Sequence, residues 1–130
     1  MRCNVGQTWD GANCKGAPAG LTLSDAMVRA ADTNKGKGYA GHTKWRLPTR
    51  TELGSLLICL HDAEMVQQNC PTQPAGKDAQ PIAFPGDPDR AYWTSTHASD
   101  GSPASILFAP VPMYGFSDPG EELYLRLVSR

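Results

Sequence analysis

The sequence predicts a single, loop-rich α+β domain, and three observations carry this prediction. The chain has 130 residues, a length that suits one hydrophobic core. A capped segment with a leucine stripe and several short alternating segments indicate that helices and strands both occur. The 13 glycines and 11 prolines indicate that turns and irregular loops form much of the remaining backbone.

Charge and hydropathy argue against several classes of function. The formal net charge of −1 gives no reason to expect a nucleic-acid partner. No apolar run approaches the ~20 residues that a membrane-spanning helix needs, so we expect no membrane insertion. The residues after Met1 are polar and do not form a signal peptide, so export would require a signal or upstream region beyond this chain.

Residues 1–20 are expected to form a small disulfide-closed unit with Trp9 packed as a lid over the domain. Cys3 and Cys14 bracket a glycine-rich stretch in which Asp10-Gly11 is typical of a hairpin tip.

Four cysteines allow three pairings, and two local disulfides fit the spacing best. We therefore expect the bonds Cys3–Cys14 and Cys59–Cys70. Neither spacing is C-x-x-C, which argues against zinc or a thioredoxin-type redox role. The alternative is four reduced, buried thiols in a cytosolic protein, whereas oxidised cysteines imply the periplasm, the cell surface or the medium.

A first helix is expected to begin at a Thr22 or Ser24 cap and to stop by Asn34. Its modest apolar stripe consists of Ala26, Met27, Ala30 and Ala31. The glycine-rich loop from Lys35 to Gly41 opens the most basic part of the chain. Its candidate anion-binding residues are Lys35, Lys37 and Lys44, which could attract sulfate or carboxylate groups of a glycan; a solvated surface is the alternative.

The strongest local signal lies between Trp45 and Leu60. Thr49 and Glu52 form a capping box, in which each side chain satisfies a backbone N–H at the start of a helix. The helix then carries one apolar stripe, made of Leu53, Leu56, Leu57 and Leu60. Upstream, residues 44–47 alternate as in a short half-buried strand. This unit is interpreted as scaffold.

The second half of the chain combines a long excursion with three strands. Residues 62–88 are rich in proline and glycine, and Ile82 and Phe84 are expected to anchor them to the core. The strand Tyr92–Thr96 is expected to pair with an antiparallel strand at Ser105–Ala109. A loop with aromatic residues follows, and a last strand, Leu123–Val128, is apolar on both faces and is expected inside the sheet.

Several segments together resemble the Lcl C-terminal domain family, the domain at the end of bacterial collagen-like adhesins. These segments are CNVGQTWDGANCKG, DAMVRAA, YAGHTKWRLPTRTEL, YWTST and YLRLV. The resemblance implies a C-type-lectin-like fold, with two helices flanking a small twisted antiparallel sheet and long loops on one side. It also implies exported or surface-attached proteins, some trimeric and some binding sulfated polysaccharides.

The residues that carry the resemblance are interpreted as mainly structural. They are Trp45, Arg46, Leu47, Pro48, Glu52, Leu53, Trp93, Ser95 and Arg126. We expect either Arg46 or Arg126 to pair with Glu52 beneath the loops.

The chain departs from calcium-dependent lectins of that fold, because it lacks their Glu-Pro-Asn or Gln-Pro-Asp and Trp-Asn-Asp motifs. Scattered acidic residues could still hold calcium, although such residues more often solvate a turn. They are Asp87, Asp89, Asp118, Glu121 and Glu122. We expect no metal site.

No catalytic constellation is evident. The histidines His42, His61 and His97 lack the spacing of zinc ligands. Cys59 and His61 lie two residues apart on a helix and face different directions. We therefore expect neither enzymatic activity nor a cofactor.

Binding through the loops is the remaining function. The candidate ligand-binding residues combine aromatic rings with short polar groups, as adaptable binding surfaces do. They are Tyr92, His97, Ser99, Asp100, Met113, Tyr114, Phe116 and Asp118. Two hypotheses follow: a glycan-binding adhesin tip, or a protein-interaction module that forms a homotrimer or binds a receptor. Tyr114 and Phe116 could alternatively only pin their own loop.

Overall fold

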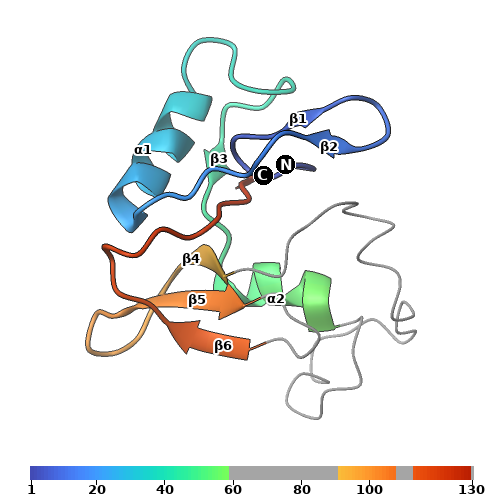
Figure 1. Cartoon of the computed structure of the whole chain (residues 1–130). Helices are drawn as coiled ribbons and strands as arrows, with labels where there is room; N and C mark the ends of the chain where they lie inside the picture. Colours follow the sequence, from blue (N-terminus) through green and yellow to red (C-terminus); the bar gives the residue numbers. More distant parts are fainter. Residues whose placement is uncertain (59–90, 108–112, 130) are drawn as a thin grey trace.

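The computed structural model describes residues 1–58, 91–107 and 113–129, without the side chains of residues 55–58 and 113. Within these ranges the chain forms two helices and three small antiparallel sheets, which is a small α+β fold (Figure 1). The helices are α1 (Leu23–Thr33) and α2 (Arg50–Ile58). The strands are β1 (Thr8–Trp9), β2 (Cys14–Lys15), β3 (Trp45–Arg46), β4 (Ala91–His97), β5 (Pro103–Leu107), β6 (Met113–Phe116) and β7 (Val128–Ser129).

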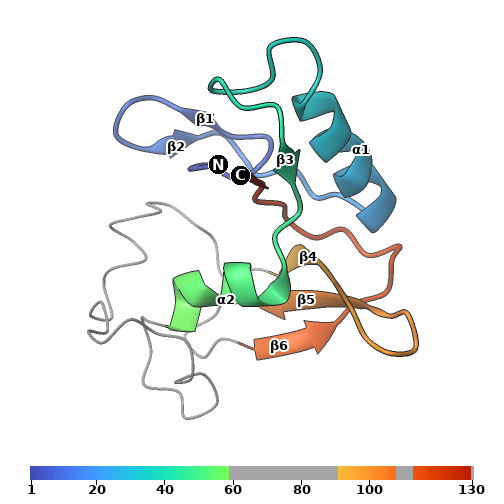
Figure 2. The ribbon, with the colours of Figure 1, turned by 180° about the vertical axis from the view of Figure 1, so that it is seen from behind.

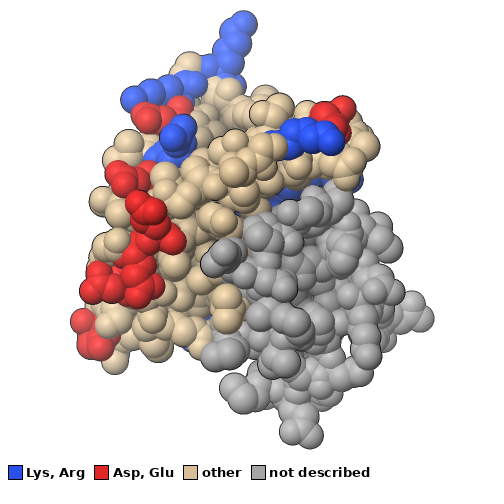
Figure 3. Space-filling model, in the orientation of Figure 1, with Lys and Arg blue, Asp and Glu red and all other residues tan. Residues whose placement is uncertain are grey.

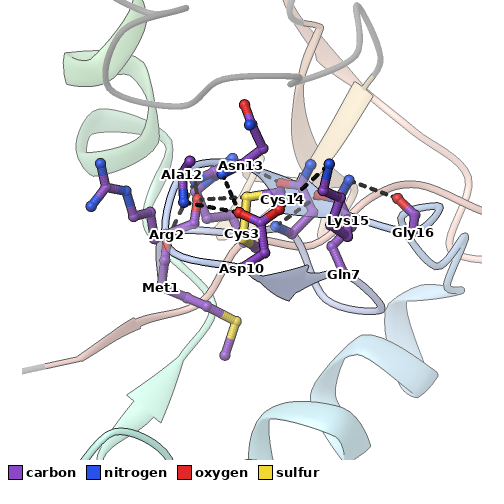
Figure 4. Close-up of a disulfide and its surroundings, with 12 residues drawn as sticks. Met1, Arg2, Cys3, Gln7, Asp10, Ala12, Asn13, Cys14, Lys15 and Gly16 are labelled. Atoms are coloured by element: carbon purple, nitrogen blue, oxygen red, sulfur yellow. Dashed lines mark hydrogen bonds and ion pairs between the residues drawn. A yellow bond between two sulfur atoms is a disulfide. The ribbon is translucent and has the colours of Figure 1, made fainter.

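The N-terminal unit is a disulfide-closed hairpin, as predicted. Cys3 and Cys14 are bonded, and the turn between β1 and β2 is held by Asp10, whose Oδ1 accepts the backbone N–H groups of Ala12 and Asn13 at 2.9 and 2.7 Å (Figure 4). Trp9 is half-buried and packs under the guanidinium of Arg2, 4.0 Å from the ring centroid, instead of joining the core. The Cys59–Cys70 bond lies outside the described residues.

Helix α1 begins and ends where its caps predict. The hydroxyl of Thr22 accepts the backbone N–H of Asp25, and Asn34 is the C-cap. Ala26 and Ala30 are buried against the core, but Met27 is 60% exposed and Ala31 is also exposed. Two of the four residues predicted to form the apolar stripe, Met27 and Ala31, are therefore not part of the buried face. Ala26 and Ala30 lie four residues apart on one face, whereas the next residue along turns away by about 100°.

Asn34 also positions β3, which pairs with β7 on its other side. The Asn34 amide donates to the backbone oxygen of Trp45 at 2.8 Å and accepts its N–H at 2.6 Å. The side chain thus satisfies β3 as a neighbouring strand would. Arg46 in turn pairs with Val128 of β7.

Helix α2 confirms the capping box. The Glu52 N–H donates to the Thr49 hydroxyl at 3.1 Å, and the Thr49 N–H donates to the Glu52 carboxylate at 2.8 Å. Leu53 is 1% exposed and packs with Tyr92 and Ile106 of the neighbouring sheet. The other stripe positions, Leu56, Leu57 and Leu60, lie outside what the structure describes of side chains.

The predicted pairing of Glu52 with an arginine is confirmed for Arg46. Arg126 takes a different place: it is 2% exposed and donates to the backbone oxygens of Met1 and Arg2 and to Asn4 Oδ1.

The three-stranded sheet has the order β4-β5-β6, and α2 packs on β4 and β5 (Figures 1 and 2). The predicted β4–β5 pair is confirmed, with Tyr92 opposite Ile106. The segment Met113–Phe116, expected as a loop, is instead strand β6, because it pairs along the free edge of β5 with Ile106 opposite Tyr114. The 62–88 excursion lies outside the described residues.

The predicted strand Leu123–Val128 is wrong in its extent, because only Val128–Ser129 forms a strand. The segment before it bonds to several partners in turn: Leu123 to Leu21, and Tyr124 to the N–H of Trp93. Such changes of partner prevent a continuous ladder. Its expected position inside a sheet is also wrong, because among the described residues β7 pairs only with β3, in a two-stranded sheet. Leu125 and Leu127 are fully buried because the segment before β7 packs in the core.

The core consists of two clusters, one on each side of β4. Trp93 joins the larger cluster with Trp45, Leu125 and Leu127, and its indole donates to the Leu21 oxygen at 2.6 Å. Tyr92 belongs to the second cluster beneath α2. Neighbouring residues of one strand therefore face different clusters, as the pleat requires. The described helices are all too short or too polar to cross a membrane.

Candidate functional site

A shallow cavity of about 510 Å³ lies where the β4–β5 turn meets the segment after β6. We call it the Phe116 pocket. It is lined by Asp100, Gly101, Ser102, Pro103, Phe116, Ser117, Asp118 and Pro119.

The β4–β5 turn forms one wall of the Phe116 pocket and is closed by its own hydrogen bonds. The Ala98 N–H donates to the Ser102 oxygen at 2.8 Å, and the Gly101 N–H donates to the Ala98 oxygen at 3.0 Å. Asp100 Oδ1 accepts the Ser102 N–H at 2.9 Å. Gly101 has a φ of +86°, which a residue with a side chain adopts only with strain. The Asp100 carboxylate is thus fixed before any ligand arrives.

The opposite wall, residues 117–120, is anchored to the sheet and to α1. The Ser117 N–H donates to the Pro103 oxygen at 3.1 Å, and the Leu23 N–H donates to the Pro119 oxygen at 3.1 Å. Asp118 Oδ1 accepts the Gly120 N–H at 2.8 Å. Both walls are therefore pre-formed.

Phe116 supplies an apolar surface to the pocket. Its side chain is 58% exposed, whereas Tyr114, two residues earlier on β6, is half-buried against the core cluster of Leu53 and Ile106. The sheet therefore uses Tyr114 for packing and presents Phe116 to solvent.

The pocket is negatively charged. Among the described residues, no lysine, arginine or histidine lines it. The Ser102 backbone N–H, followed by the Ser102 hydroxyl, lowers the pKa of Asp100, which keeps this carboxylate ionised. Acidic side chains gather along this edge of the molecule, over the start of α1 and the two loops beside it (Figure 3).

The structure brings three of the predicted ligand-binding residues together and separates the others. Asp100, Phe116 and Asp118 line one pocket. Ser99 is exposed at the turn and lies outside that lining. His97 lines a different cavity, beside α1. Tyr92 and Tyr114 belong to the core cluster beneath α2, and the side chain of Met113 lies outside the described residues.

Tyr92 is wrongly predicted as a surface residue, because it is fully buried. Its hydroxyl accepts a hydrogen bond from Asn4 Nδ2 at 2.9 Å, and its ring meets that of Tyr124 edge-on, with centroids 5.8 Å apart. Tyr114 also packs, with the Arg50 guanidinium 5.2 Å from its ring centroid. Both rings face the α2 side of the sheet. Tyr114 therefore has the packing role that was the alternative to ligand binding.

The predicted anion-binding lysines are all exposed in or beside the loop after α1. Lys35 forms an ion pair with Asp32 at 2.6 Å, which offsets part of its charge. Lys37 and Lys44 form no ion pair with any described residue. These two are the more available cations of that loop.

Acidic and histidine side chains do not gather into a metal-binding group anywhere in the described ranges. Asp118 is used by its own turn, and Asp87, Asp89 and His61 lie outside those ranges. His42 packs edge-on against Trp45, with ring centroids 5.8 Å apart.

Sequence reasoning missed a groove of about 450 Å³ beside α1. It is lined by Leu23, Met27, Ala30, Ala31, Asn34, Trp45, Arg46, Leu47, Thr94, Ser95 and His97. The signal that could have revealed it is Met27, a large apolar residue that directly follows the buried Ala26 and therefore points about 100° away from the buried face. Met27 is 60% exposed.

Comparison with known proteins identifies the family of this chain. A family model described as the Lcl C-terminal domain matches residues 2–129, nearly the whole chain. No curated protein and no solved structure matches the chain. Because the family match extends from the disulfide hairpin through the Phe116 pocket to β7, the chain belongs to the Lcl C-terminal domain family.

Proposed function

We propose that this protein is a non-enzymatic, adhesin-type binding domain that recognises a glycan through the Phe116 pocket. The observation that carries the proposal is the convergence of Asp100, Phe116 and Asp118 on one pre-formed cavity. These residues come from the β4–β5 turn, from β6 and from the segment after it.

The chemistry of these side chains suits a sugar. The exposed Phe116 ring can stack on the C–H face of a pyranose, which buries apolar surface on both partners. The second carboxylate oxygens of Asp100 and Asp118 can accept hydrogen bonds from sugar hydroxyls. Because the walls are fixed by internal hydrogen bonds, little ordering opposes binding.

The proposal also includes a fold and a cellular location. We propose a C-type-lectin-like arrangement, which two helices, small antiparallel sheets and loops gathered beside the sheet support. The Cys3–Cys14 disulfide supports secretion or exposure at a cell surface. A sulfated polysaccharide would instead bind at the loop that carries Lys35, Lys37 and Lys44.

A glycan array with wild-type protein and a Phe116→Ala variant tests the site. We expect binding to neutral or amino sugars that Phe116→Ala loses. Val28→Ala is the matched control, because Val28 is 59% exposed and lies outside the pocket. The proposal would be contradicted if no glycan binds at about 1 mM, or if Phe116→Ala binds as tightly as wild type.

The second candidate function is a protein-interaction module, which the groove beside α1 favours. Met27 lines that groove and is 60% exposed, so it offers apolar surface there, as docking faces do. A homotrimer or a surface-protein receptor would cover it. Light scattering at several concentrations tests self-association: a trimer that Met27→Ser dissociates would support this alternative, and a monomer at all concentrations would contradict the trimer.

A further inference from the structure

Resting on the proposed function, we propose that the sugar bound in the Phe116 pocket carries a free amine, as a de-N-acetylated hexosamine does, and carries no sulfate. This deepens the proposed function, because it names the charge of the ligand.

The charge of the walls is the first argument. Asp100 and Asp118 each use Oδ1 to accept a backbone N–H of their own turn. The Ser102 hydroxyl also hydrogen bonds to the Asp100 carboxylate. Both aspartates are exposed, so each carboxylate keeps acceptor positions that a ligand can reach. Two carboxylates in one pocket without a cation attract an ammonium group and repel a sulfate.

The surroundings strengthen the same preference. Glu121 and Glu122 follow the pocket wall, and the Glu121 N–H donates to the Asp118 oxygen at 2.9 Å, which keeps this acidic segment folded beside the pocket. The exposed cations Lys37 and Lys44 lie in the loop between α1 and β3, outside the pocket lining. A sulfated chain would therefore meet repulsion here, whatever its contact with that loop.

Phe116 provides the second, independent argument. The face of an aromatic ring carries partial negative charge, and a cation above it is attracted. The same face accommodates the apolar side of a sugar ring. A glucosamine unit can place the apolar face of its ring on Phe116 and direct its ammonium group toward Asp100 or Asp118, at the rim of the aromatic face. An N-acetylated sugar can satisfy only the stacking.

Calorimetric titration with three probes tests the proposal: chitotriose, its fully de-N-acetylated form and a sulfated counterpart. The buffer is kept at low salt and at about pH 5.5, where amino-sugar amines are protonated and aspartates are ionised. We expect the de-N-acetylated trisaccharide to bind about tenfold more tightly than chitotriose, the scale of one charge-assisted hydrogen bond. The sulfated form should bind most weakly.

Variants assign the preference to the pocket. Asp100→Asn and Asp118→Asn each retain an oxygen that can accept the turn N–H, so the walls stay formed. Each should reduce the preference for the amine several-fold without weakening chitotriose. Asp32→Asn removes the same charge outside the pocket and should change nothing.

The outcomes separate the two proposals. If chitotriose binds through Phe116 but the amine brings no gain, the charge assignment is wrong and the glycan site stands. If no sugar binds, the proposed function itself fails. A preference that survives both asparagine variants, or a tri-lysine peptide that binds as tightly as the amino sugar, would also overturn the assignment.

Discussion

Arg46 and Glu52 form a two-point ion pair, with Nη1 2.8 Å from Oε2 and Nη2 2.6 Å from Oε1. The same Oε2 accepts the Thr49 N–H, so one carboxylate both caps α2 and holds β3. The Arg46 hydrogen bonds, followed by the Thr49 N–H, lower the pKa of Glu52 from 4.5 to about 2. A strand and a helix separated by a proline turn are thereby fixed to each other.

Glu52→Gln should reduce the free energy of unfolding by about 1 kcal/mol, because the pair is partly exposed and screened by solvent. The pKa of Glu52 in the folded state lies below its ordinary value. Its stabilisation is therefore present above about pH 4.5 and is lost as the pH falls toward about 2. Urea unfolding across this range should show a smaller pH dependence for the variant, and parallel curves would contradict the assignment.

Asn34→Ala should destabilise the protein by about 1–3 kcal/mol, because it leaves the N–H and C=O of Trp45 without their side-chain partner. The control is Asn13→Ala at the exposed hairpin turn, whose side chain makes no hydrogen bond to any described residue. Chemical denaturation of both variants measures the difference. Equal stabilities would show that water replaces the Asn34 amide without loss.

Replacing Cys3 and Cys14 together by serine should cost about 3 kcal/mol by the loop-entropy model, since the bond closes a short loop. Thermal unfolding of this variant with and without a reductant measures the cost. A reductant should lower the unfolding temperature of wild type more than that of the variant, because the variant lacks this bond. If wild type and variant unfold together under oxidising conditions, the hairpin disulfide does not stabilise the fold.

Tyr92→Phe should lower stability by about 1 kcal/mol and leave the proposed glycan binding unchanged, because the hydroxyl bonds to Asn4 inside the core. Phe116→Ala should behave in the opposite way, since Phe116 is exposed. Measuring both properties on both variants separates packing from recognition. Loss of binding in Tyr92→Phe with full stability would restore Tyr92 as a ligand contact.

Gly38→Ala should be more destabilising than Gly36→Ala. Both glycines have positive φ values, +66° and +61°, so the backbone strain is similar. A Cβ at Gly38 would collide with the backbone of His42, whereas one at Gly36 would meet open space. The difference between the unfolding midpoints of the two variants measures the effect of the collision. Equal midpoints would show that the loop moves to accommodate the added Cβ.

Local signals in the sequence predicted the fold best. The Thr49–Glu52 box, the Thr22 cap and the Cys3–Cys14 hairpin each depend on residues close in sequence, and all three are confirmed. Strand β6 was missed because its partner, β5, determines it. The interrupted path before β7 depends on changing long-range partners in the same way.

The site was predicted in part for a related reason. Composition identified Asp100, Phe116 and Asp118 as candidates, but their convergence depends on the pairing of β5 with β6. Tyr92 was misassigned because the strand is buried on both faces, with Trp93 on one side and Tyr92 on the other. Alternation alone does not indicate which aromatic residue meets solvent.

The β4–β5 turn closes through Ala98 and Ser102, and Ser99 at its tip touches neither core cluster. Substitutions there can therefore accumulate at almost no cost to folding. The sequence at this tip can therefore diversify while the framework beneath it stays unchanged.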